Sequence, residues 1–114
     1  MIIKIVGAVA IVFLLLALFV GGSQPQAVGL FEPPLDKVVH AFYYAVITQC
    51  LGRLICLRLS LSIFLALSIG IADELHQLYL PGRSADILDL IADAIGITLS
   101  ALIIKLSKFK LNKA

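Results

Sequence analysis

The polar side chains that could carry chemistry fall in two short stretches of an otherwise apolar chain. Residues 36–40 read D-K-V-V-H, and residues 73–93 contain five carboxylates together with His76 and Arg83. A charged side chain at membrane depth is costly, so it usually faces the protein interior and serves a function. Carboxylates and a histidine can act as general acids or bases, and an arginine can hold an anion such as phosphate.

Within these stretches the polar residues recur at helical spacing. Asp36 and His40 are four residues apart, as are Asp89 and Asp93, whereas Glu74 and Gln77 are three apart. Residues at these spacings lie on one face of a helix. Three expected helices therefore each present a polar pair, and the pairs are expected to lie near one depth.

Asp93 calls for a partner more than the other carboxylates do. A capping role and the positive end of the helix macrodipole explain Asp86, and partly explain Asp89. Asp93 lies too far into the expected helix for either effect. Its partner is expected to be Arg83, His40, a polar amide, a proton or a metal ion.

Three interpretations of this cluster remain open: catalysis, binding or transport of a polar headgroup or ion, and hydrogen bonding that only holds helices together. The candidate catalytic residues are His40, Glu74, Arg83, Asp89 and Asp93, with Asp36, Tyr44 and Gln77 in support. Arg83 is the expected anion contact, and Glu74 or His40 the expected proton-handling group. Whether the protein is an enzyme stays open. A metal could bind His40 with Glu74, Asp89 or Asp93, but without an HExxH-type motif we expect neither metal nor cofactor.

The composition indicates a membrane protein. Of the 114 residues, 61% are hydrophobic and 14% are charged, whereas about a quarter of a typical soluble domain is charged. The length allows one membrane domain, residues 1–114. A net charge of +2 is too small to indicate a nucleic-acid partner, and Cys50 and Cys56 are expected to be free thiols.

Four apolar segments predict an all-α fold, a bundle of four transmembrane helices. They run over about residues 5–20, 38–55, 57–80 and 87–104, and a span needs roughly 20 mostly apolar residues. Small residues recur every fourth position at Ser62, Ala66 and Gly70, and again at Ala92, Gly96 and Ser100. Such rows let membrane helices approach closely, and the first row continues to Glu74, which would then face the bundle interior.

The basic residues predict that both termini are cytoplasmic. With the N-terminus inside, seven of the nine fall on the cytoplasmic side: Lys4, Arg53, Arg58, Lys105, Lys108, Lys110 and Lys113. The polar pairs then lie at the outer face. The alternative of a cleaved signal peptide over residues 1–22 is disfavoured by its long apolar core and by the absence of an A-x-A site.

The motifs resemble those of the VanZ-like family of small bacterial membrane proteins. The resemblance covers about residues 30–104 and rests on D-K-x-x-H at 36–40 with Tyr44, E-x-x-Q at 74–77 with P-G-R-S at 81–84, and D-x-x-x-D-x-x-G at 89–96. The chain departs from the family pattern at Ala41, where the family often has Phe, at Asp93, where it often has Asn, and at Ser100, where it often has Gly.

This resemblance implies a multi-pass protein of the bacterial cytoplasmic membrane with membrane lipids as partners. The founding member is associated with low-level teicoplanin resistance, so a link to antibiotic resistance is implied but is not expected of every member. A site at headgroup depth would meet an envelope lipid intermediate or its phosphate headgroup. The alternatives are a non-catalytic scaffold and a small ion or solute transport module. No oligomeric state is indicated.

Overall fold

The computed structural model describes residues 1–113, and that part of the chain is helical without any strand. Four α-helices follow the four apolar segments: α1 (Ile2–Phe19), α2 (Leu35–Gln49), α3 (Leu59–Gln77) and α4 (Ile87–Lys113). Two short 3-10 helices, η1 (Gly21–Ser23) and η2 (Pro25–Ala27), lie between α1 and α2, and a π-helical turn, η3 (Cys50–Leu54), continues α2. The expected all-α class is confirmed.

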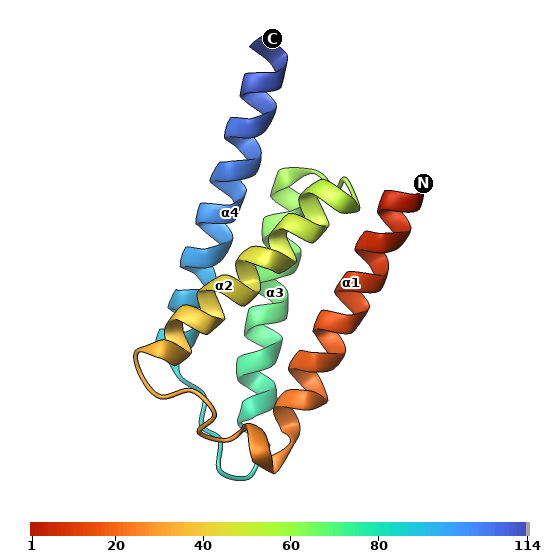
Figure 1. Cartoon of the computed structure of the whole chain (residues 1–114). Coiled ribbons are helices and arrows are strands. Elements are labelled where there is room, and N and C mark those ends of the chain that lie inside the picture. The colour runs from red at the N-terminus through yellow and green to blue at the C-terminus, as the bar shows by residue number, and fades with distance from the viewer. Residues whose placement is uncertain (114) are drawn as a thin grey trace.

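The helices alternate in direction, which gathers the two long connections at one end (Figure 1). Residues 20–34 and 78–86 meet there, and this end is called the loop end below. α2 and α4 both begin at the loop end, whereas α1 and α3 finish there. The N-terminus and the end of α4 both lie toward the opposite end of the bundle, where α4 extends well beyond the turn that joins η3 to α3 (Figure 1).

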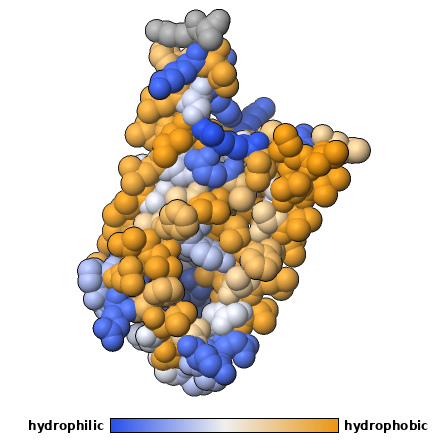
Figure 2. Space-filling model, viewed as in Figure 1, coloured by the Kyte–Doolittle hydropathy of each residue, from blue (hydrophilic) through white to orange (hydrophobic). Residues whose placement is uncertain are grey.

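Three of the helices are long and apolar enough to cross a membrane: the stretches are Ile2–Ser23, Leu59–Gln77 and Ile87–Asn112. α2 differs from the expected second span because its α-helical part has only 15 residues before the π-helical turn begins. On the face in view, hydrophobic residues cover most of the surface, and the most hydrophilic residues gather mainly toward its two ends (Figure 2). That distribution is typical of a helical membrane protein.

α1 packs on the outside of the other helices and is largely exposed, and Gly7 is its one buried residue. A Cβ atom at Gly7 would lie 2.7 Å from the Leu54 Cβ atom, so the absent side chain lets α1 approach the π-helical turn. Nearer the loop end, the Tyr43 hydroxyl donates a hydrogen bond to the Leu14 carbonyl oxygen. An apolar helix with few buried residues is suited to facing lipid.

α2 and α4 pack against each other more extensively than any other two helices of the described chain. A Cβ atom at Gly96 would lie 1.9 Å from the carbonyl oxygen of Ala41, so the two backbones touch at this point. One turn further on, the Ser100 hydroxyl donates to the Ala45 carbonyl oxygen at 2.8 Å and accepts from the Gln49 amide at 2.8 Å. The small residues of α4 therefore pack against α2 and fix the register of the two helices along their common axis.

Replacing Gly96 with alanine is expected to destabilise the protein, although alanine favours a helix over glycine by about 1 kcal/mol. The added methyl group would overlap the backbone of α2 at Ala41, and overpacking of this kind costs about 1–3 kcal/mol. Thermal unfolding in detergent measures the effect. Gly21→Ala is the control, because a Cβ atom there meets nothing within 4 Å. Equal unfolding temperatures for Gly96→Ala and wild type would contradict the close contact.

Candidate functional site

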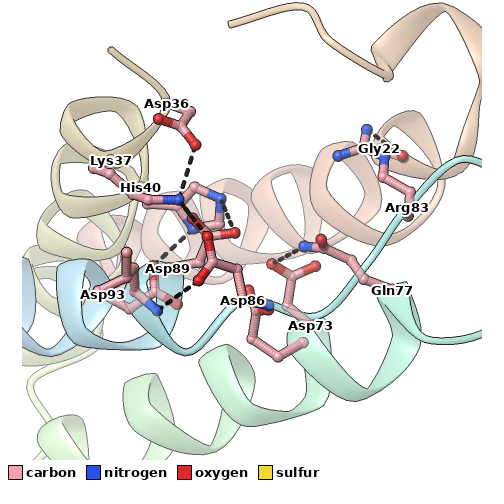
Figure 3. Close-up of polar contacts among 12 residues, drawn as sticks. Gly22, Asp36, Lys37, His40, Asp73, Gln77, Arg83, Asp86, Asp89 and Asp93 are labelled. Carbon is pink, nitrogen blue, oxygen red and sulfur yellow. Dashed lines mark hydrogen bonds and ion pairs between the residues drawn. The ribbon is translucent and has the colours of Figure 1, made fainter. Parts of the chain in front are cut away.

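The predicted polar pairs come together at the loop end (Figure 3). Lys37, in the first turn of α2, is the centre of the ion pairs: its ammonium group lies 2.9 Å from Asp36 and 2.9 Å from Asp86, and it also contacts Asp89. The hydrogen bond from Lys37 holds the pKa of Asp86, in the loop before α4, below its ordinary value. One cation thus joins the start of α2 to the start of α4.

The partner of Asp93 is His40, one of the candidates that the sequence analysis named. The Nδ1 atom of His40 lies 2.9 Å from Oδ1 of Asp93, which is fully buried. Arg83, the other charged candidate, does not make this contact. The second oxygen, Oδ2 of Asp93, is buried without a hydrogen bond among the described residues, and the bare Gly70 leaves room for it.

α3 contributes Asp73, Glu74 and Gln77, all of them buried. The Glu74 oxygen Oε2 accepts a hydrogen bond from the backbone N–H of Asp86 at 2.9 Å, which ties α3 to the start of α4. Gln77 makes no hydrogen bond to Glu74, with which it was expected to share a helix face. Its amide instead donates to Asp73 over a long 3.4 Å.

Arg83 lies apart from the carboxylates, beyond Gln77 as seen from Asp93 (Figure 3). Its guanidinium donates to the Gly22 carbonyl oxygen at 3.0 Å and so joins the two long connections. The Nε atom of Arg83 is buried without a hydrogen-bond partner within residues 1–113. This donor is free to meet an anion.

Tyr44 follows His40 by one helical turn and is fully buried. The two rings are nearly parallel, 13° apart, with 6.4 Å between their centroids. The hydroxyl of Tyr44 has no hydrogen-bond partner in the described chain. Buried hydroxyl groups normally have a hydrogen-bond partner, so the unpaired Tyr44 hydroxyl shows that the described chain itself does not satisfy every polar group near His40.

The sequence analysis gave no site role to Lys37, Asp73 or Asp86. Lys37 entered only through the D-K-x-x-H motif and the count of basic residues, although a cation three residues before His40 in a helix faces the same way. Asp73 is 3% exposed. Its position directly before Glu74 in the sequence could have marked it as a member of the cluster. Asp86 was expected to cap α4, and its Oδ1 atom does accept a hydrogen bond from the backbone N–H of Leu88 at 2.9 Å.

Two adjoining cavities open at this site. One of about 290 Å³ is polar and is lined by Lys37, Asp86 and Asp89 among others. The second, of about 470 Å³, is mostly apolar and extends between α1 and α2 past Leu18 and Tyr43. His40 and Arg83 line both cavities. A polar hollow beside an apolar one matches an amphiphilic ligand.

Fold and site together define a helical membrane protein with a buried polar cluster at one end of its bundle. The model of the VanZ/LLP1 family matches residues 2–108, nearly the whole chain, and the protein belongs to that family. The match confirms the resemblance drawn from the motifs and extends it through α1. No curated protein and no solved structure matches the chain.

Asp93→Asn is expected to keep the protein folded, because the remaining Oδ1 atom can still accept the hydrogen bond of His40. Asp93→Leu removes the acceptor and leaves the N–H of the partly buried His40 imidazole unpaired, at a cost of about 1 kcal/mol. Unfolding in detergent compares the two variants with wild type. An Asn variant as unstable as the Leu variant would show that position 93 needs a carboxylate.

Proposed function

We propose that the chain crosses the bacterial cytoplasmic membrane four times, with both termini in the cytoplasm. Residues 35–54 are helical throughout, and α2 with its π-helical turn is long enough to serve as the second span, at about 1.5 Å per residue. Arg53, Arg58 and the lysines near both termini then fall on the cytoplasmic side, as the positive-inside rule requires. The loop end and its polar cluster face outward.

The topology is tested by reporter fusions at Gln26, Arg53 and the C-terminus. A reporter that is active only on the outer side of the membrane is expected to be active at Gln26 and inactive at Arg53 and at the C-terminus. An active fusion at the C-terminus would overturn the orientation, and with it the outward position of the cluster.

We propose that the polar cluster handles an envelope lipid through its phosphate headgroup. The paired cavities carry this proposal, because the headgroup would occupy the polar hollow while an acyl or prenyl chain follows the apolar one between α1 and α2. Arg83 stands on their shared wall with a free Nε donor. The starts of α2 and α4, whose helix dipoles are positive there, add to the attraction for a phosphate.

In this proposal the remaining residues have separate tasks. Glu74 or His40 handles a proton, Asp93 holds the orientation of His40, and Asp89 shapes the polar cavity. Asp36 and Gln77 orient neighbouring side chains. Whether a bond is broken is not part of the proposal, and teicoplanin resistance is an implication of family membership alone.

Arg83→Gln is expected to weaken binding of a phosphate-bearing lipid by about 10–100-fold, the equivalent of one charge-assisted hydrogen bond. The measurement titrates phosphatidic acid into the protein in nanodiscs of zwitterionic lipid and follows binding by native mass spectrometry. Arg58→Gln is the matched control, because Arg58 is an exposed arginine at the opposite end of the bundle.

The competing function is a scaffold in which the cluster only joins helices, and the ion pairs of Lys37 between α2 and α4 favour it. The same titration separates the two. If Arg83→Gln and Arg58→Gln bind the lipid equally while both fold normally, the headgroup proposal fails and the scaffold stands. If only Arg83→Gln loses the lipid and its unfolding temperature is unchanged, the site is a binding site.

A further inference from the structure

Three residues of the cluster each hold position through one of their two side-chain heteroatoms and make no hydrogen bond through the other in the described chain. His40 uses Nδ1 for Asp93, Glu74 uses Oε2 for the Asp86 backbone, and Asp89 uses Oδ1 for Lys37. The remaining atoms, Nε2 of His40, Oε1 of Glu74 and Oδ2 of Asp89, make no hydrogen bond within residues 1–113. One ligand atom from each of these residues lies within 4.8 Å of the others.

The free oxygen of Glu74 is the most informative of these atoms. Glu74 is only 7% exposed, and its Oε1 atom is buried without a hydrogen bond among the described residues. An unpaired buried carboxylate oxygen is costly, and buried polar atoms in native proteins nearly always have a partner. Some group that the protein chain itself does not provide is therefore expected beside Oε1.

The contact between His40 and Asp93 prepares the imidazole as a ligand. When Nδ1 carries the proton and donates to Asp93, the lone pair sits on Nε2. Nε2 lies 3.9 Å from Oδ2 of Asp89. Metal-binding histidines commonly donate their other ring N–H to a carboxylate, which fixes the tautomer and raises the basicity of the ligand atom.

The charges at the loop end also favour an added cation. Six carboxylates gather there, namely Asp36, Asp73, Glu74, Asp86, Asp89 and Asp93. The permanent cations that accompany them are Lys37, which is shared among three of the acids, and Arg83, which faces the Gly22 carbonyl. A protonated His40 would still leave negative charge in excess.

We propose that His40, Glu74 and Asp89 bind one divalent transition-metal ion, with Asp93 as the residue that positions His40. A single imidazole with two carboxylates suits Zn²⁺ or Mn²⁺, and three protein ligands leave a coordination position open. His40 and Asp89 line the polar cavity, so that position faces it. Ligands around one ion lie roughly 3–3.5 Å apart for bonds of about 2.1 Å. The three ligand atoms lie within 4.8 Å of one another, so they would close in by up to about 1–2 Å when the ion binds.

This site does not depend on the proposed lipid, because its ligands come entirely from the protein. A bound ion would add positive charge beside a phosphate in the polar cavity. The alternative occupant of the cluster is a proton shared between Glu74 and its neighbours, which would satisfy Oε1 without any metal.

The test uses the full chain purified in detergent with an affinity tag that contains no histidine. The protein is stripped with a chelator, and Zn²⁺ or Mn²⁺ alone is then titrated, with bound metal measured by elemental analysis after desalting and Mn²⁺ also by electron paramagnetic resonance. About one ion per chain is expected for wild type, together with a raised unfolding temperature. Phosphate lipid is absent throughout, so the result is independent of the headgroup proposal.

Glu74→Gln and His40→Gln are expected to lower the affinity by at least about 100-fold, since even residues behind the ligands typically contribute 10–100-fold. Asp93→Asn, which keeps the hydrogen bond to His40, is expected to lose about tenfold. Asp73→Asn is the matched control: it removes a buried carboxylate from the same turn of α3 as Glu74 but is not a ligand, so it should lower the affinity far less than the ligand variants do.

Wild-type protein that takes up neither ion in stoichiometric amount, or variants at positions 40 and 74 that bind as well as Asp73→Asn does, would overturn the metal site. A shared proton would then be the better account of the cluster. Should both ligand variants fail to fold, the stripped and reloaded wild type decides the question by its stoichiometry.

Discussion

The backbone contact between α2 and α4 is the constraint on which the polar site depends. Because Gly96 has no side chain, the two helices touch at Ala41, and Ser100 holds them one turn further on. This register places His40 opposite Asp93 and Lys37 opposite Asp89. In a bundle whose helices gain little from burying apolar surface away from lipid, close packing and hydrogen bonds between helices must supply the association.

Hydrogen bonds and ion pairs fix the orientation of the side chains that cluster at the loop end. Glu74, Asp89 and His40 are each fixed through one atom, which leaves the other atom at a defined place. A site whose groups are already oriented loses little freedom when it binds a ligand. Arg83 is fixed separately by Gly22, on the wall that the polar and apolar cavities share. The arrangement therefore separates an acid-rich part from an anion-binding part of one opening.

Helical spacing was enough to predict which faces carry the polar groups, because side chains three or four residues apart share a face regardless of what packs there. Asp36 with His40 and Asp89 with Asp93 were found in this way. Spacing within a helix says nothing about the partner across an interface. Arg83 therefore bonds the Gly22 carbonyl oxygen rather than Asp93. Gln77 bonds Asp73, which lies four residues before it on the same helix, a pairing that the spacing also allowed. The end of α2 in a π-helical turn had no local signal either.

The sequence by itself determined an all-α membrane protein of the VanZ/LLP1 family, because apolar length and motif spacing are properties of the chain alone. It also determined that Asp93 needed a partner, since burial of an unpaired carboxylate is costly wherever it occurs. Only the tertiary structure decided that the partner is His40, and that Lys37 joins two helices. Those contacts depend on the register of α2 along α4. The packing of Gly96 against the Ala41 carbonyl group sets this register, and no local sequence pattern encodes it.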